Sequence, residues 1–257
     1  MNLHFKKIGE GRPFIILHGL FGSGDNWMSF ARALSEKGFA VYLVDLRNHG
    51  HSPHDLNHNY QLMSNDLHEL ILNENLRDAI ILGHSMGGKA AMTLAINHTN
   101  VLSALIVVDI ATLYYPIHHR SILDALISVD LSKINSRDEV DQQLGLTISE
   151  NSTRQFLMKN LYRMDDKSFG WRFNLSVLNK QIEFVSQEMT SANPIQLSVL
   201  FIKGANSNYI KENQFEECKK IFPDAELAII ENAGHWVHAD QPLALLECVL
   251  SFVQGIK

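Results

Sequence analysis

The sequence contains few of the residues that mark a disulfide-bonded, metal-dependent or membrane-spanning protein. Only two of its 257 residues are cysteine, Cys218 and Cys248, and neither lies in a CxxC or Cys/His metal pattern. We expect both to be free thiols in helices, as is usual in a reducing compartment. The longest apolar runs, such as residues 199–202, are far shorter than the roughly 18 residues that a membrane helix needs.

Two further absences narrow the function. Residues 1–8 lack the apolar stretch and small-residue cleavage site of a secretory signal, so a cytoplasmic location is expected. Acidic residues also outnumber basic ones: the chain has 28 Asp and Glu and 22 Lys and Arg, which gives a formal net charge of −6. This balance disfavours binding to polyanions. We therefore expect no nucleic-acid and no membrane partner, and a monomer or weak homodimer that acts on a small molecule.

Short apolar runs alternate with helical patterns in the first half of the chain and again near its end. Strands are expected at residues 13–17, 40–44, 79–82, 105–108, 198–203 and 226–230. Helices are expected at residues 27–37, 62–75, 87–97, 213–221 and 242–253. This alternation predicts an α/β fold with a mostly parallel sheet flanked by helices on both faces. From about residue 114 to 195 there is no strand signal, which indicates a helical insertion over the carboxyl edge of the strands.

A candidate nucleophile lies in the sequence Gly83-His84-Ser85-Met86-Gly87, which fits the pattern G-x-S-x-G. The motif follows one predicted strand and opens one predicted helix, as a nucleophile elbow does. Glycines two residues before and two after the serine let the chain make this tight turn without a clash. The turn would expose the Ser85 hydroxyl and aim a helix N-terminus at developing negative charge.

An oxyanion hole is expected from two backbone N–H groups. One is that of Met86, directly after the serine, and the other belongs to the loop His18-Gly19-Leu20-Phe21 after the first predicted strand. Leu20 is the preferred loop donor and Phe21 the alternative. We expect His18 to be structural, hydrogen-bonding this loop. Residues 45–52 are expected to shape a turn beside the site.

The general base and its acid partner should follow later strands of the sheet. His235 lies in a loop after the last predicted strand and before the last helix, which suits a base for Ser85. The loop at 204–209 lacks the carboxylate expected there, whereas Asp109 ends an apolar strand at the carboxyl edge. Ser85, Asp109 and His235 keep the chain order of this kind of triad. Asp109 could instead cap a turn, in which case Ser207 or Asn206 would lie near the histidine. With Asp109 as the acid, Ser207 is expected to hydrogen-bond the pair of Asp109 and His235.

These motifs together resemble the YbfF-like bacterial esterases of the α/β-hydrolase superfamily, from about residue 15 to 252. The resemblance rests on the strings at residues 18–23, 47–50, 83–89, 108–111, 171–174 and 234–238. It implies an α/β-hydrolase fold whose core comprises residues 1–113 and 196–257. It also implies a helical cap, residues 114–195, inserted after the sixth core strand, with no metal and no organic cofactor. It supports Asp109 as the acid and a serine at position 207, and it differs at Thr112, where that family often has proline.

The substrate-binding residues are expected to be Phe21, Trp171, Arg172 and Trp236. For the segment at residues 171–174 two interpretations stay open. It walls the pocket, or its two aromatic side chains pack the cap onto the core while Arg172 bonds to a carboxylate or to backbone. A pocket of this kind would be largely apolar with few polar groups.

The expected reaction is hydrolysis of small carboxylic esters through an acyl-enzyme. Hydrolysis of acyl-CoA thioesters at the same site is an alternative, which basic residues such as Arg120 and Arg172 at the cap entrance would favour. Cleavage of a lactone or a carbon–carbon bond also fits the triad. Dehalogenase and epoxide hydrolase chemistry needs an aspartate where Ser85 stands, and is excluded. A non-catalytic binding module is a further alternative, although such proteins usually lack a member of the triad.

Overall fold

The computed structural model describes residues 1–256, except for the side chains of Glu212 and Asn213. Seven strands form one sheet in the order β1-β3-β2-β4-β5-β8-β9. Only the edge strand β1 is antiparallel to its neighbour, so the sheet is mixed but mostly parallel. The sheet strands are β1 (Phe5–Ile8), β2 (Arg12–Leu17), β3 (Phe39–Val44), β4 (Ala79–His84), β5 (Leu102–Val108), β8 (Ser198–Gly204) and β9 (Glu226–Ile230).

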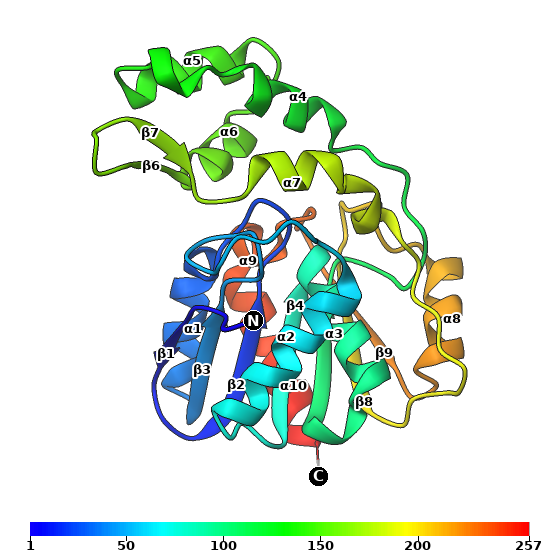
Figure 1. The fold of residues 1–257 in the computed structure, drawn as a ribbon. Coiled ribbons are helices and arrows are strands. Elements are labelled where there is room, and N and C mark those ends of the chain that lie inside the picture. Colours follow the sequence, from blue (N-terminus) through cyan, green and yellow to red (C-terminus); the bar gives the residue numbers. More distant parts are fainter. Residues whose placement is uncertain (257) are drawn as a thin grey trace.

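Helices cover both faces of this sheet (Figure 1). One apolar cluster joins one face to α2, α3 and α8, and a second cluster joins the other face to α1 and α10. The helices are α1 (Met28–Ser35), α2 (Tyr60–Asn73), α3 (Met86–Asn97), α4 (Arg120–Ser128), α5 (Arg137–Gly145), α6 (Asn151–Met158), α7 (Leu175–Lys180), α8 (Glu212–Ile221), α9 (Val237–Asp240) and α10 (Pro242–Gly255). Four short 3₁₀ segments complete them: η1 (Gly24–Trp27), η2 (Thr99–Val101), η3 (Leu131–Lys133) and η4 (Ile182–Ser186).

The central strands are buried on both faces, which explains why their sequences read as continuous apolar runs. Every residue of β3 and β4 is buried. The six strands and five helices predicted from the sequence are all present, with ends that differ by up to three residues. Strand β1 was not predicted, because it is a short edge strand, FKKI, whose residues are exposed or only partly buried. Its two lysines suit an unpaired sheet edge.

The segment between β5 and β8 forms the expected insertion, and it arches over the carboxyl ends of the strands (Figure 1). It holds α4 to α7, but the expectation of no strand there was wrong. Strands β6 (Leu161–Arg163) and β7 (Phe169–Trp171) form a small antiparallel hairpin. Three-residue strands are too short to leave a periodic signal. The insertion follows the fifth strand of this sheet, not the sixth, since only four sheet strands precede β5.

No helix within residues 1–256 combines the length and the apolar character needed to cross a bilayer. Cys218 and Cys248 are free thiols in α8 and α10, as expected, and Cys218 is buried. Burial raises the pKa of both thiols above the ordinary range, so neither has the electropositive surroundings of a reactive cysteine.

Candidate active site

Ser85 lies on a strained turn between β4 and α3. Its backbone has φ 52° and ψ −117°, a region that a residue with a side chain seldom adopts. Gly83 permits the turn, because a Cβ there would lie 2.2 Å from the carbonyl oxygen of Gly87. The serine N–H continues the sheet ladder by donating to the Val108 oxygen at 3.0 Å. The tight strand-to-helix turn predicted around Ser85 is therefore present, at the carboxyl edge of the sheet.

Asp109 follows the neighbouring strand β5 at the same edge, and it too has a left-handed backbone, with φ 53°. Its side chain is fully buried. One carboxylate oxygen, Oδ2, accepts hydrogen bonds from His235 Nδ1 at 2.7 Å and from Ser207 Oγ at 2.5 Å. The other oxygen, Oδ1, accepts from the Gly204 N–H at 3.1 Å. The carboxylate therefore has three donors and is oriented towards the histidine, as a triad acid must be.

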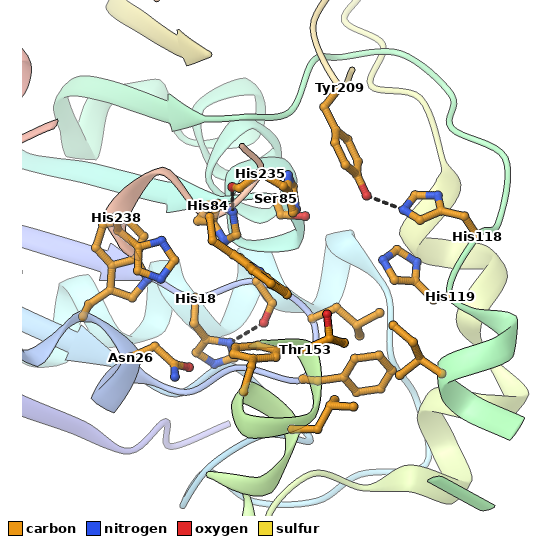
Figure 2. Close-up of a pocket in the computed structure, with 18 residues that line it drawn as sticks. His18, Asn26, His84, Ser85, His118, His119, Thr153, Tyr209, His235 and His238 are labelled. Atoms are coloured by element: carbon orange, nitrogen blue, oxygen red, sulfur yellow. Dashed lines mark hydrogen bonds between the residues drawn. The ribbon is translucent and has the colours of Figure 1, made fainter. Parts of the chain in front are cut away.

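His235 reaches Asp109 from the loop between β9 and α9. Because the carboxylate can only accept, the proton of the imidazole lies on Nδ1 and Nε2 is left as the basic nitrogen. Figure 2 shows this ring beside Ser85. The Tyr209 ring stacks on it, with centroids 4.1 Å apart and an interplanar angle of 19°. The His235 carbonyl accepts from His84 Nε2 at 2.9 Å. Burial holds the pKa of His84 well below its usual value, so this donor is a neutral imidazole.

The loop after β2 carries the second expected oxyanion donor. The Phe21 N–H already donates to His49 Nε2 at 3.3 Å, which favours Leu20 over Phe21 as the donor to a substrate. His18 bonds the loop as expected, since its Nδ1 donates to the Gly19 oxygen at 2.8 Å. Its Nε2 accepts from the Leu46 N–H at 3.0 Å. Burial lowers the pKa of His18, which keeps the ring neutral for both contacts.

Ser85 and His235 open into a cavity of about 240 Å³ between the sheet and the insertion (Figure 2). The core strands and loops form its floor, and the insertion forms its roof. Its floor includes His18, Gly19, Leu20, Phe21, Asn26, Trp27, His84, Tyr209, Trp236 and His238. Its roof consists of His118, His119, Ile122, Thr153, Phe156 and Leu157. The lining is mostly apolar and aromatic, as in sites for small organic ligands.

Two of the four predicted substrate-binding residues, Phe21 and Trp236, line this cavity, but Trp171 and Arg172 do not. Trp171 stacks on Phe173 with ring centroids 5.4 Å apart, and Phe173 in turn packs edge-on against Phe21. The Arg172 guanidinium lies 4.0 Å from the centre of the Tyr162 ring. The aromatic rings of Trp171 and Phe173 therefore pack β7 against Phe21 of the core, whereas the Arg172 side chain stacks within the β6–β7 hairpin and not on a carboxylate.

Sequence reasoning missed the roof residues and Tyr209. Thr153, Phe156 and Leu157 are spaced i, i+3 and i+4 along α6, so they share one face of that helix. That spacing was visible in the sequence, but it does not say which surface the face covers. Tyr209 had no local signal, since its ring meets His235 only through the tertiary fold.

No metal-binding arrangement was found around the cavity within the described residues. Elsewhere in the described part of the chain, the side chains of His4, Asp45 and His51 are spaced to hold a metal ion, but none of the three lines the cavity. The polar groups that do line it include the hydroxyls of Ser85, Thr153 and Tyr209, several imidazoles and an amide. Such a set suits acyl transfer by nucleophilic catalysis.

The class of protein that this fold and site define is confirmed by comparison with known proteins. Residues 12–242 match the family described as the alpha/beta hydrolase fold. The sn-1-specific diacylglycerol lipase ABHD11 of Xenopus laevis is 36% identical, over 95% of this chain and 80% of its own length. Esterase YbfF of Escherichia coli K12 is 36% identical, over 94% of this chain and 92% of its own length.

A solved structure described as a marine microorganism esterase is more similar still. It is 43% identical, covers 98% of this chain and 99% of its own, and superimposes with a TM-score of 0.96. The chain therefore belongs to the α/β-hydrolase family, and it is an esterase or lipase of that family.

Proposed function

We propose that this enzyme hydrolyses small carboxylic esters with Ser85 as nucleophile, His235 as base and Asp109 as the acid that orients the base. The observation that carries the proposal is the hydrogen bond between the buried Asp109 carboxylate and His235, which lines the same small apolar cavity as Ser85 on its strained turn. A nucleophile, its base and an orienting carboxylate in this order are the working parts of acyl transfer.

In the proposed reaction, His235 Nε2 takes the Ser85 proton as the hydroxyl oxygen attacks the ester carbonyl. The N–H groups of Leu20 and Met86 hold the negative oxygen of the tetrahedral intermediate, each contributing about 3–4 kcal/mol. The intermediate expels the alkoxide, which leaves as the alcohol with the proton from His235. Water then attacks the acyl-enzyme in the same way and releases the carboxylic acid and Ser85.

Cavity size and charge support a small, uncharged ester. The volume of about 240 Å³ lies below the roughly 300–1,000 Å³ of pockets for drug-sized ligands. The basic residues that would favour a coenzyme A thioester are used elsewhere: Arg120 donates to Asn179 at 2.6 Å, and Arg172 stacks on Tyr162. We therefore favour esters over acyl-CoA thioesters. We further propose residues 1–113 and 196–257 as the catalytic core and residues 114–195 as a cap that selects the substrate.

The experiment is hydrolysis of p-nitrophenyl esters from acetate to octanoate by the wild-type chain and by Ser85→Ala. Wild type should turn over the short esters best, and Ser85→Ala should lower kcat by about 10⁴- to 10⁶-fold. Ser251→Ala is the matched control, because Ser251 is exposed on α10 away from the cavity. A wild-type chain that cleaves acetyl-CoA but no ester would refute the substrate class, and failure to react with a fluorophosphonate would indicate a binding module.

A further inference from the structure

A second group of chemically active side chains lies outside the cavity, at the sheet edge where β1 meets β3. It comprises His4, Asp45 and His51, whose ligand atoms all lie within 4.8 Å of one another. The register of β1 against β3 explains the first pair. Phe5 lies opposite Val44, and the Asp45 N–H donates to the His4 oxygen at 2.9 Å. His4 and Asp45 are therefore cross-strand neighbours, whose side chains are in reach of each other.

His51 joins this pair from the turn that follows β3. Its backbone N–H donates to Asp45 Oδ2 at 2.8 Å, and its ring nitrogen Nδ1 lies 3.6 Å from the same oxygen. The centroids of the His4 and His51 rings lie 5.0 Å apart. The His51 side chain is 45% exposed and that of Asp45 only 6% exposed. The group thus has a buried carboxylate at its base and one imidazole that can move and admit an ion from solvent.

His4 carries a polar atom without a partner. Its ring nitrogen Nε2 is buried and makes no hydrogen bond within the described residues. Leaving a buried polar atom unpaired costs about 1–3 kcal/mol. A native structure normally retains such an atom only where a water, an ion or a function accounts for it. Asp45 has the complementary capacity, since a carboxylate offers about four lone-pair positions and its two backbone N–H donors occupy only two.

We infer that His4, Asp45 and His51 form a binding site for a divalent transition metal, with Zn²⁺ as the best-suited ion. Two imidazoles and one carboxylate are ligands that zinc prefers, whereas Mg²⁺ and Ca²⁺ prefer oxygen ligands alone. Ligand atoms around a tetrahedral ion with bonds of about 2.0–2.1 Å lie roughly 3.3–3.4 Å apart. The present separations need to contract by about 1.5 Å at most, and the exposed His51 ring can supply that movement. Water would complete the coordination.

Asp45 connects the site to the loop at residues 18–21, which carries the proposed oxyanion donor Leu20. Its Oδ1 accepts the Gly24 N–H at 2.7 Å, just beyond the loop that carries Leu20. The next residue, Leu46, donates to His18, which bonds the same loop. A metal bound here would therefore brace the entry to α1 and the turn after β3 without touching Ser85, and its first effect would be on the stability of the fold.

The test is titration of the full-length chain with Zn²⁺, followed by calorimetry and by thermal unfolding. One Zn²⁺ should bind per chain, and at a free concentration about 100 times its Kd it should raise Tm by roughly 5–10 °C. His51→Ala should weaken binding at least tenfold and still fold, because the side chain is half exposed. His4→Gln should weaken binding in the same way.

The matched control is His68→Ala, because His68 and His98 form a stacked histidine pair elsewhere, with ring centroids 3.8 Å apart. That variant should bind Zn²⁺ as wild type does. The inference is overturned if wild type shows no saturable Zn²⁺ binding up to millimolar concentration. It is overturned equally if His51→Ala retains the wild-type Kd and Tm shift, or if His68→Ala is the variant that loses them.

Discussion

The sheet core and the insertion differ in how their residues reach the cavity. Ser85 and Asp109 are attached to the ends of buried strands, and the ladder bonds of their backbones fix their spacing. The insertion supplies none of the proposed catalytic groups, but it supplies the roof, from α4, α6 and the linker before α4. The difference teaches that the proposed catalytic groups lie along one sheet edge, whereas a separate layer of short helices covers the cavity.

The joint between the two regions contains buried polar contacts beside its apolar packing. Lys89 on α3 is buried and donates to the carbonyl oxygens of Leu113 and Gln187, one in each of the two linkers of the insertion. Its ammonium lies 5.1 Å from the Tyr115 ring centre. Burial nevertheless lowers the pKa of Lys89 to about 7. Such directional contacts locate the insertion accurately above the core, because each leaves a buried group unpaired if it is broken.

The largest expected effect tests the core alone. Asp109→Asn should lower kcat by about 10⁴-fold, because the amide favours the wrong tautomer of His235. Steady-state hydrolysis of p-nitrophenyl acetate measures it. Ser207→Ala is the control, since it removes one hydrogen bond to the same carboxylate and leaves the acceptor for His235 in place. It should cost far less, and equal losses in both variants would contradict the assignment of the acid.

Acid should destabilise both regions through buried neutral histidines. Burial lowers the pKa of His58 to about 3 and of His238 to about 4 in the core, and of His119 to about 3 in the insertion. Each ring binds its proton more readily in the unfolded chain, so its contribution is intact above pH 6.5 and is lost as the pH falls. At pH 5.5 the three together should lower the free energy of unfolding by about 4 kcal/mol.

Denaturant unfolding between pH 8 and 5 measures this loss, and His119→Phe separates the two regions. At pH 5.5 that variant should lose about 1.4 kcal/mol less of its free energy of unfolding than wild type does, because it removes only the insertion's histidine. A slope that His119→Phe leaves unchanged would mean that the insertion does not share in the acid response.

A smaller effect tests the joint. Asn160 of the insertion is buried, and its side-chain amide donates to the carbonyl oxygen of Phe21 at 2.7 Å. Asn160→Ala leaves that buried oxygen without its donor, so the free energy of unfolding should fall by about 1–3 kcal/mol. KM should rise as well, because Phe21 lines the cavity. Asn135→Ala, on the exposed surface of the insertion, is the control and should alter neither value.

The smallest effect tests the roof. Phe156 lines the cavity from α6 and lies against Trp236, with ring centroids 5.5 Å apart. Phe156→Ala should enlarge the acyl site and shift the ratio of kcat/KM for octanoate over acetate upward by roughly tenfold. Trp171→Ala is the comparison, because Trp171 packs the insertion outside the cavity. An equal shift in Trp171→Ala would show that the insertion acts as a whole and not through its lining.

Local sequence patterns were sufficient to predict most of the helices and strands of the sheet core. The glycines on either side of Ser85 predict its tight turn. Asp109 and His235 follow strands that are predicted by clear apolar runs. Parallel strands end at one edge, so residues that follow them were expected to meet there, and they do. The prediction failed for strand β1 and for the β6–β7 hairpin, since edge strands and three-residue strands carry almost no periodicity.

The sequence by itself determined the fold class, the sheet core and the candidate triad, because these depend on periods of two and 3.6 residues and on short motifs. Only the tertiary structure decided which residues line the cavity. It placed Trp171 and Arg172 in the packing of the insertion, Phe156 and Leu157 in the roof, and Tyr209 on the His235 ring. The reason is physical: these contacts join segments far apart in the chain, and no local propensity records which distant surface an apolar face will cover.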